Sequence, residues 1–223
     1  LRGFSETTGF WVYLQSSGPS STKNVFSEST DDSLIYSVPE FDLNFQFSPL
    51  DFTQVNLAVN RQMISCAHDL LDLSISDRVL DAFCGIGNFS LALARSAGRV
   101  EGLELSFASI ERANLNARNN NVRNVSFRVA DLHAKTLNLG ENCYFNKIFL
   151  DPPRSGAEGL VKRLDAKDVE RVVYVSCNPD TFGRDAKILC RRGFRLISAG
   201  IIDMFPHTTH IESIALFNRK VKL

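Results

Sequence analysis

From Arg78 onward the chain alternates between short apolar runs and longer segments whose apolar residues recur at helical spacing. We predict strands at the apolar runs, which are Val79–Ala82, Val100–Glu104, Val125–Val129, Lys147–Leu150, Val172–Ser176, Phe194–Ile202 and Ile211–Phe217. Helices are predicted in most of the gaps, over Asn88–Ala97, Phe107–Asn120, Gly159–Lys167 and Asp180–Cys190. This alternation is typical of a doubly wound α/β domain with a mostly parallel sheet. Because no helix separates the last two runs, we expect a terminal antiparallel strand at one edge.

The first part of the chain has a different pattern. Runs at Trp11–Leu14 and Leu34–Val38 predict strands, and the Ser/Gly/Thr-rich stretch Ser16–Lys23 predicts a loop or a hairpin connection. No helical periodicity is evident there, so we expect a small β-rich N-terminal segment without helices. Because the chain starts with Leu1 rather than Met, we interpret residues 1–45 as the remnant of a β-rich domain.

Residues 46–223 are predicted to form the second, catalytic domain. The alternation in Leu43–Phe47 predicts a half-buried strand across this boundary, and a helix is predicted over Asn56–Leu71. One face of that helix is apolar and is expected to face the sheet; its residues are Val59, Met63, Ala67 and Leu70.

Composition narrows the class of protein. The 223 residues have no formal net charge and 44% of them are hydrophobic, which is enough for a sizeable core. Residues 1–60 hold two basic and seven acidic residues, and a nucleic-acid-binding protein usually has a stronger basic excess.

The sequence contains no apolar run of about 18 residues, so no membrane span is predicted. No signal segment is evident. Five cysteines without a C-x-x-C pair argue against disulfides and a closed zinc site, so we expect a cytoplasmic protein without metal.

A glycine-rich turn follows the first predicted strand of the second domain. Cys84-Gly85-Ile86-Gly87 lies between this strand and the next helix, where a backbone without side chains can approach a ligand and helix N–H groups are free. Any βαβ unit needs a tight turn here, so the glycines alone are weak evidence. Glu104 ends the next predicted strand, where a carboxylate normally holds ribose hydroxyls. Together these residues predict a cofactor that carries adenosine.

Asp151-Pro152-Pro153-Arg154 follows another apolar strand, at the sheet edge where open α/β sheets bind ligands. Two prolines also end any strand, so an ordinary turn is the alternative. The functional interpretation is a rigid shelf beside the transferred group, with Asp151 as acceptor. Amino-group methyltransferases with a similar motif have an aromatic residue where this chain has Arg154, which argues against N-methylation of adenine.

Cys177 ends the buried run Val172–Ser176 and precedes Asn178-Pro179, which suit a helix N-cap and first helical position. A cysteine before a helix N-terminus is expected to have a lowered pKa, which favours the nucleophilic thiolate. Most cysteines on apolar strands are inert core residues, and that alternative stands. We expect no chemistry from the remaining cysteines, Cys66, Cys84, Cys143 and Cys190.

The last predicted strand is preceded by the loop that begins at Phe205 and contains His207 and His210. A metal would need a third ligand, and none is near in sequence. Glu212 stands in an alternating apolar pattern, so it is either a solvent-facing strand residue or a general base at the mouth of a pocket.

Five stretches together resemble the RNA 5-methyluridine (uracil-C5) methyltransferases and occur in that family's order. They are FSPLDFTQVN (Phe47–Asn56), LDAFCGIGNF (Leu80–Phe89), LDPPRSG (Leu150–Gly156), YVSCNP (Tyr174–Pro179) and DMFPHTTHIES (Asp203–Ser213). The sequences of these motifs are most similar to those of the branch that methylates bacterial 23S ribosomal RNA, and relatives that act on transfer RNA share most of them. The resemblance implies a class I methyltransferase with a Rossmann-like fold that uses S-adenosyl-L-methionine (SAM).

The resemblance also implies the site residues. SAM would be surrounded by Gln54, Phe83, Asn88, Glu104, Asp131 and Asp151, with Glu104 at the ribose and Asp131 near the adenine. Cys177 would add to carbon 6 of uracil, and Glu212 would remove the proton from carbon 5. The uridine must leave its stack to reach such a pocket, and Phe205 or His207 would pack beside it.

Partners follow from the same resemblance. We expect an RNA substrate, rRNA before tRNA, no membrane, and a monomer. Some family members carry an upstream RNA-binding β-barrel and an iron–sulfur cluster bound by cysteines. This sequence contains neither the barrel nor its cysteines, so an iron–sulfur cluster is expected only in a missing upstream domain. Residues 1–45 would then be the end of a central, RNA-contacting domain.

Three other hypotheses remain open. A methyltransferase for another acceptor, such as an exocyclic amine, would not need Cys177. A non-catalytic module that binds SAM or RNA would show no turnover on uridine. A nicotinamide dehydrogenase is disfavoured because no third glycine follows Gly87 and because the sheet ends in an antiparallel pair.

Overall fold

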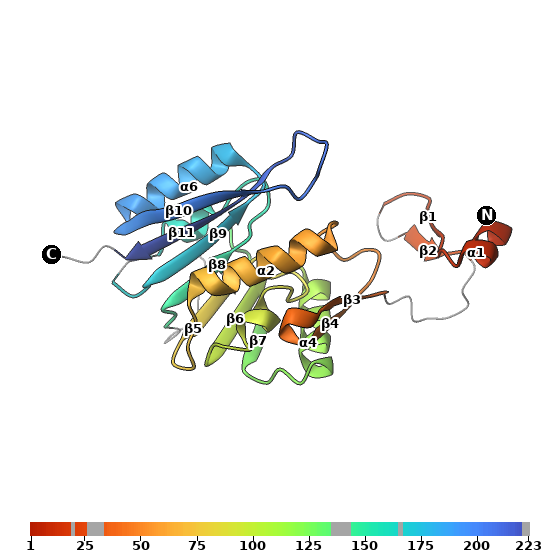
Figure 1. The fold of residues 1–223 in the computed structure, drawn as a ribbon, viewed down its shortest axis with the longest axis horizontal. Helices are drawn as coiled ribbons and strands as arrows, with labels where there is room; N and C mark the ends of the chain where they lie inside the picture. Colours follow the sequence, from red (N-terminus) through yellow and green to blue (C-terminus); the bar gives the residue numbers. More distant parts are fainter. Residues whose placement is uncertain (19–20, 26–33, 135–143, 165–166, 220–223) are drawn as a thin grey trace.

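The computed structural model describes residues 1–223 except 19–20, 26–33, 135–143, 165–166 and 220–223. Within this described part, seven strands form one sheet in the order β10-β11-β9-β8-β5-β6-β7 (Figure 1). Their bounds are β5 (Arg78–Ala82), β6 (Arg99–Glu104), β7 (Val125–Val129), β8 (Lys147–Leu150), β9 (Arg171–Ser176), β10 (Phe194–Ile202) and β11 (Glu212–Arg219).

The pairing confirms the predicted sheet. Strands β5 to β9 pair in parallel, whereas β11 is antiparallel to both β9 and β10. The chain runs outward from β5 to β7 and then returns to place β8 on the other side of β5. The strand order therefore reverses between β5 and β8, and open α/β sheets bind ligands at such a point.

Helices cover both faces of this sheet. The helices are α2 (Leu57–Leu71), α3 (Ser90–Leu93), α4 (Phe107–Asn119), α5 (Glu158–Val161) and α6 (Pro179–Arg191). Figure 1 shows α2 and α6 on opposite faces, and each face has its own core. Val79 and Phe149 pack in the core under α2, while their neighbours Leu80 and Ile148 pack in the core under α6. This alternation explains why the strands read as continuous apolar runs.

Two helices are shorter than predicted. We expected Asn88–Ala97, but α3 is the single turn Ser90–Leu93. The side chain of Asn124 donates to the carbonyls of Ala94 and Ala97, both at 2.8 Å, and so caps the end of this segment. Helix α5 ends at Val161 rather than Lys167, and part of the predicted span, residues 165–166, lies outside the described residues.

Helix α2 matches its prediction, with the Asn56 side chain as N-cap accepting from the Val59 N–H at 3.2 Å. The buried stripe is rotated relative to the predicted one. Val59 and Leu70 are half-buried, and the fully buried residues are Asn60, Met63, Ile64, Ala67 and Leu71. None of the helices in the described part of the chain has the length and apolar character needed to cross a bilayer.

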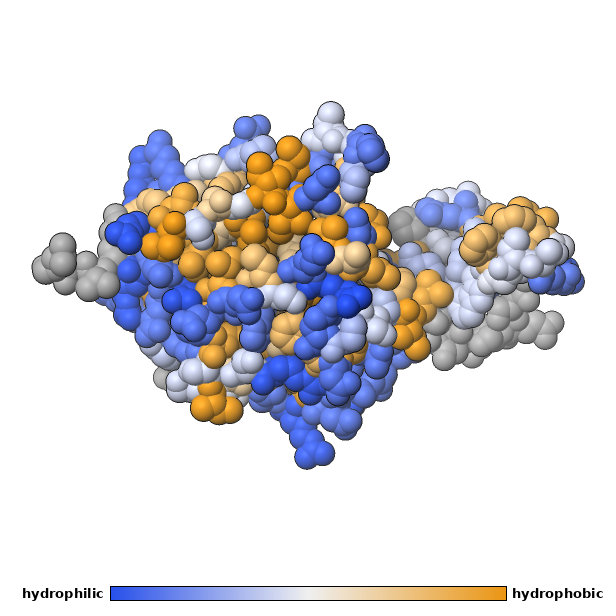
Figure 2. All heavy atoms as spheres, in the orientation of Figure 1, coloured by the Kyte–Doolittle hydropathy of each residue, from blue (hydrophilic) through white to orange (hydrophobic). Residues whose placement is uncertain are grey.

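The N-terminal segment contains strands, as predicted, but also a helix. Helix α1 (Arg2–Thr8) precedes a two-stranded sheet of β1 (Tyr13–Gln15) and β2 (Thr22–Asn24). Threonine hydroxyls bond back to carbonyls within α1, and Gly9 ends it in the left-handed region at φ 71°, so the expectation of no helix was wrong. No residue of α1 is buried, and Figure 2 shows apolar atoms gathered on its surface.

A second hairpin packs against the main sheet domain. It consists of β3 (Leu34–Val38), the short 3₁₀ turn η2 (Pro39–Phe41) and β4 (Leu43–Phe47). Tyr36 and Phe45 are buried in the core under α2. On α4, Asn116 donates to the Gln46 carbonyl at 3.1 Å and accepts from its N–H at 2.8 Å. The hairpin runs across residue 45, where we place the domain boundary, and that boundary stays a prediction.

Candidate active site

A cavity of about 870 Å³ opens at the carboxyl ends of the central strands. It lies where the strand order reverses, and its size suits a cofactor together with part of a substrate. All eight site residues from the sequence line it: Gln54, Phe83, Asn88, Glu104, Asp131, Asp151, Cys177 and Glu212. The fold thus brings together residues separated by as many as 158 positions in the chain.

The loop after β5 approaches the cavity with its backbone. Phe83, Gly85 and Gly87 have φ values of 68°, 53° and 89°, in the region that favours glycine. A Cβ on Gly87 would lie 3.1 Å from the Phe127 ring, so this glycine also allows close packing against β7. The non-glycine Phe83 is held there by its N–H, which donates to the Leu103 carbonyl at 2.8 Å.

Glu104 is fixed by three backbone N–H groups. Its Oε1 accepts from Leu105 at 2.8 Å and Ser106 at 3.0 Å, and its Oε2 accepts from Gly85 at 3.3 Å. Oε2 accepts only one of these bonds and keeps acceptor capacity for a ribose hydroxyl. Asp131 lies further along the same wall, exposed, and its Oδ1 accepts from the His133 N–H at 2.9 Å.

Asn88 is joined to two residues that sequence reasoning missed. Asn88 and the buried Asn60 exchange amide hydrogen bonds of 2.9 and 3.1 Å, and the Tyr36 hydroxyl donates to Asn88 Oδ1 at 2.8 Å. Asn88 therefore links the loop after β5 to α2 and to the β3–β4 hairpin. One of its two side-chain N–H groups is left to bind a ligand. Asn60 interrupts an apolar helix face, and this was the only sign of it in the sequence.

Cys177 follows β9 and precedes α6, as predicted. Asn178 is the N-cap, its Oδ1 accepting from the Asp180 N–H at 3.0 Å, and Pro179 is the first helical residue. The predicted lowering of the thiol pKa was wrong: the pKa of Cys177 is raised by burial and by the carboxyl groups of Glu212 and Asp151. A backbone hydrogen bond and the Arg154 cation act in the opposite direction but are outweighed.

Glu212 lies opposite Cys177 because of the register of β11. Ser213 pairs with Ser176 in the antiparallel ladder, so the residue before one faces the residue after the other. Glu212 as a whole residue is only 6% exposed, which excludes the solvent-facing alternative. Burial raises its pKa, and Arg154 acts against this rise. A buried carboxyl beside a thiol is suited to accept a proton.

Asp151 completes this group of acids. Burial, Glu212 and Asp81 together raise the pKa of Asp151 to about 7, and Gln54 partly offsets the rise by donating to Oδ2 at 3.4 Å. Below the glycine loop, burial raises the pKa of Asp81 to about 7, and among the described residues its Oδ1 has no hydrogen-bond partner. This concentration of carboxyl groups fits a ligand with positive charge.

The last loop contributes Phe205 and His210 to the wall, with ring centroids 6.0 Å apart. His207 is exposed, has φ 67° and is not among the lining residues. In the described part of the chain, no three His, Cys, Asp or Glu side chains are grouped as metal ligands. Of the other cysteines, Cys84 is buried beside the cavity, Cys66 and Cys190 lie in helices, and Cys143 is outside the described residues.

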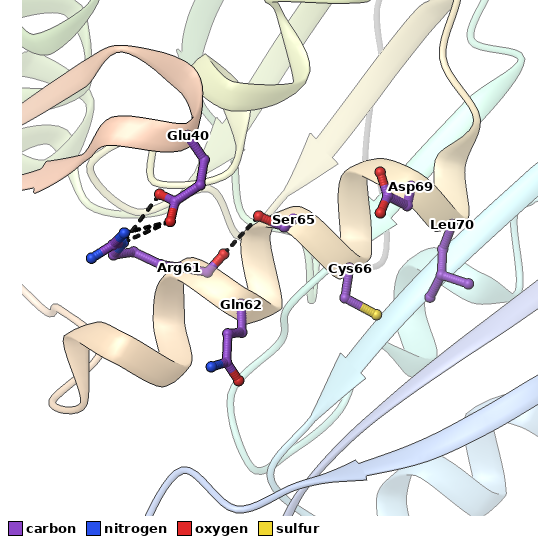
Figure 3. A pocket seen from close by; sticks show the side chains of 7 residues that line it. All are labelled: Glu40, Arg61, Gln62, Ser65, Cys66, Asp69 and Leu70. Carbon is purple, nitrogen blue, oxygen red and sulfur yellow. Dashed lines mark hydrogen bonds and ion pairs between the residues drawn. The ribbon is translucent and has the colours of Figure 1, made fainter.

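A second hollow, of about 500 Å³, lies on the outer side of α2 (Figure 3). Arg61 Nε donates there to both carboxylate oxygens of Glu40, at 2.9 and 3.0 Å, and Arg61 Nη2 donates to Oε1 at 2.5 Å. Its charged groups satisfy one another, and it contains no predicted site residue.

Comparison with known proteins identifies the family. Residues 28–220 match the family model described as tRNA (Uracil-5-)-methyltransferase. The chain belongs to this family. It is 45% identical to the 23S rRNA (uracil(1939)-C(5))-methyltransferase RlmD of Hahella chejuensis and 48% identical to that of Methylococcus capsulatus. Each match covers 98% of this chain but 50% of the relative, so the chain spans about half the length of these proteins.

A solved structure of the uracil-5-methyltransferase family has the same fold. The tRNA (uracil-54, C5)-methyltransferase of Pyrococcus abyssi, in complex with S-adenosyl-L-homocysteine, superposes with a TM-score of 0.76 at 30% identity. The match covers 92% of this chain and 50% of that one. The predicted family and the Rossmann-like methyltransferase fold are therefore confirmed.

Proposed function

We propose that this chain is the catalytic domain of an RNA uracil-C5 methyltransferase that uses SAM. One observation carries the proposal: a single cavity holds a thiol, a buried carboxyl opposite it, and a carboxylate fixed for a ribose. Family membership and the relatives named above support it. The whole enzyme's target would be set partly by the half of the relatives' length that this chain does not span.

The residues present fit SAM. Glu104 would hold the ribose hydroxyls, and Phe83 and Asp131 would lie at the adenosine end of the same wall. The carboxyl groups that line the cavity suit the positive charges of the ammonium and sulfonium groups. When bound, SAM supplies an electrophilic methyl group. We place Gln54, Asn88 and Asp151 along its other side.

The chain's own residues account for the activation of uracil. Carbon 5 is a weak nucleophile until a thiolate adds to carbon 6 and converts the ring to an enolate. We assign this addition to Cys177, with its thiol proton passing to a neighbouring carboxylate and Arg154 stabilising the anion. After carbon 5 is methylated, Glu212 takes its proton, the ring double bond re-forms, and the bond to Cys177 breaks.

The uracil must enter the cavity as an extruded base, because neither face of a stacked base can accept the thiolate. Phe205 lies in the wall beside the proposed nucleophile and is suited to pack against the ring. His210 takes the place that we expected for His207, since only His210 lines the cavity.

We propose 23S rRNA as the target, with tRNA as the alternative. The named relatives with 45 to 48% identity act on rRNA, whereas the structural relative at 30% identity acts on tRNA. Incubation of the protein with SAM and each RNA, followed by nucleoside mass spectrometry, distinguishes the two. 5-Methyluridine in tRNA alone would contradict the proposed target but not the reaction.

The reaction itself is tested by trapping. In RNA that contains 5-fluorouridine, carbon 5 carries fluorine, which cannot be removed as a proton. The final elimination is therefore blocked, and the protein with SAM should form a stable adduct on the peptide that carries Cys177. Cys177→Ala should form none and still bind SAM, while the matched control Cys66→Ala, on the exposed side of α2, should react normally. Methylation by Cys177→Ala would indicate another acceptor. SAM binding with no turnover on any uridine-containing RNA would indicate a non-catalytic module.

A further inference from the structure

Asp185 is a fully buried carboxylate on α6 that the proposed reaction does not use. Its Oδ2 accepts from the Ala157 N–H at 2.6 Å and from the Tyr174 hydroxyl at 2.7 Å, and its Oδ1 accepts from Arg184 Nε at 2.9 Å. A buried charge persists only when it is bonded in this way. The elements it joins are α6, β9 and the loop after β8.

The loop after β8 contacts Asp185 and Arg184 through its backbone and not through side chains. Arg184 Nη2 donates to the Ser155 carbonyl at 2.9 Å. Gly156 has φ +76°, and a Cβ there would lie 2.5 Å from Arg184 Nη2 and 2.7 Å from Asp185 Oδ2. No side chain fits between the loop and these two residues, so the contact sets where the loop lies.

A second pair of bonds holds the other part of the same loop. Asn178 Nδ2 and Thr181 Oγ1, both from the start of α6, donate to the Arg154 carbonyl at 3.0 and 3.2 Å. The loop that carries Asp151 and Arg154 is therefore bound to the helix that begins directly after Cys177. Through the Tyr174 hydroxyl, Asp185 also holds β9 three residues before Cys177.

We propose that Asp185, together with Arg184, is a positioning residue that fixes the Asp151–Arg154 loop relative to Cys177. The proposal deepens the function proposed above and rests on it for the role of Cys177. Misplacement of reacting groups by about 1 Å can cost about a hundredfold in rate. The contacts of Asp185 therefore matter for reaction rate and not for folding alone.

The protein offers a matched control at the opposite edge of the sheet. Asp77 is 5% exposed and accepts from the Ser74 N–H and from Asn146 Nδ2, both at 2.6 Å, just before β5 begins. Asp77→Asn and Asp185→Asn make the same chemical change at buried, multiply bonded carboxylates. Both are expected to lower the melting temperature, but only Asp185 contacts elements of the site.

Two readouts separate positioning from stability, both taken well below the melting temperature of each variant. With Asp185→Asn, adduct formation on 5-fluorouridine RNA at saturating RNA and SAM should slow about tenfold or more. Labelling of Cys177 by iodoacetamide, relative to Cys66 in the same sample, should also change by about threefold or more, because the loosened loop alters both the exposure of the thiol and the position of Arg154. Asp77→Asn should change neither value and should leave SAM affinity unchanged.

Tyr174→Phe is the alternative variant if Asp185→Asn does not fold. It removes only one of the bonds to Asp185, and we expect the same two changes to a smaller degree. Equal effects of Asp77→Asn and Asp185→Asn, or unchanged Cys177 labelling in both site variants, would overturn the positioning role. Failure of the wild-type protein to form any adduct would instead count against the proposed function. The labelling ratio needs no RNA and tests Asp185 in either case.

Discussion

At the scale of single residues, Cys177 is controlled by opposing charges. Burial, and then the carboxyl groups of Glu212 and Asp151, hold the pKa of its thiol above the ordinary value, and Arg154 is the cation that acts against them. The thiolate is the reactive form, so reactivity of Cys177 should increase as the pH rises toward that raised pKa. The proposed nucleophile is therefore a neutral thiol near pH 7, and a neutral thiol is oxidised less readily than a thiolate.

Arg154→Met removes this cation and should raise the pKa of both Cys177 and Glu212 further. Iodoacetamide labelling of Cys177 across a pH series should therefore have its midpoint at higher pH, with a rate at pH 7 lower by about threefold or more. Arg154→Lys keeps the charge and should stay close to wild type. An unchanged midpoint in Arg154→Met would show that the guanidinium does not act on the thiol.

Asn60→Leu tests the amide pair behind the glycine loop. The variant removes both hydrogen bonds to Asn88 and leaves its amide buried with only Tyr36 as partner. We expect SAM affinity, measured by titration calorimetry, to fall about tenfold, because each lost bond of this kind is worth about 1 kcal/mol. Gln62→Ala, on the exposed side of the same helix, is the control. Equal affinity of the two variants would argue that Asn88 needs no support.

At the scale of elements, the end of α2 is tied to the sheet by a buried lysine. Lys147 Nζ on β8 donates to the Leu71 carbonyl at 2.9 Å and to the Asp72 carbonyl, and lies 3.2 Å from Asp77. It thus satisfies carbonyls that the helix end leaves free. Burial opposes ionisation of Asp77, but bonds from Asn146, Ser74 and Lys147 lower its pKa below the ordinary value.

Lys147→Met should destabilise the domain by about 3 kcal/mol, because it leaves Asp77 and two helix carbonyls without their buried partner. Urea unfolding at pH 7 measures this loss, and Lys187→Met on the exposed side of α6 is the control. The stability that Asp77 contributes is complete above its ordinary pKa and is lost as the pH falls through its lowered native pKa. The difference between wild type and Lys147→Met should therefore shrink in acid, and a difference constant down to pH 2 would contradict this account.

At the scale of the whole molecule, the N-terminal residues divide into two parts. Helix α1 and the β1–β2 hairpin have no residue in either core, whereas the β3–β4 hairpin is buried against α2 and α4. Tyr36 of that hairpin also lines the cavity. We therefore infer that the hairpin supports the catalytic domain, although the sequence places most of it before the boundary after residue 45.

Two truncations test this division. Removal of residues 1–33 should leave the melting temperature and SAM affinity of the remaining domain unchanged. Removal of residues 1–47 should lower the melting temperature by about 10 °C or more and weaken SAM binding, because four buried apolar side chains and the Tyr36 hydroxyl are lost. Equal behaviour of the two truncations would place the boundary after the hairpin.

The sequence by itself determined most elements and the family, and it predicted site residues that all line one cavity. Apolar runs, helix periodicity and turn residues depend on neighbours along the chain, so the strands of the sheet and the Asn178-Pro179 helix start were predictable. The motif residues followed from their order along the chain. Where local signals were weak or mixed, as in α1 and α3, the predictions were wrong or too long.

Only the tertiary structure decided the environment of those residues. The register that sets Glu212 opposite Cys177, the raised pKa of that thiol, and the link from Asn88 to Asn60 and Tyr36 all join segments distant in sequence. Desolvation and the distances between charges depend on the packed fold, and no local pattern encodes them. The helix N-terminus alone predicted a lowered thiol pKa; burial of the thiol, together with the carboxyl groups of Glu212 and Asp151 that the sheet brings beside it, reversed the sign.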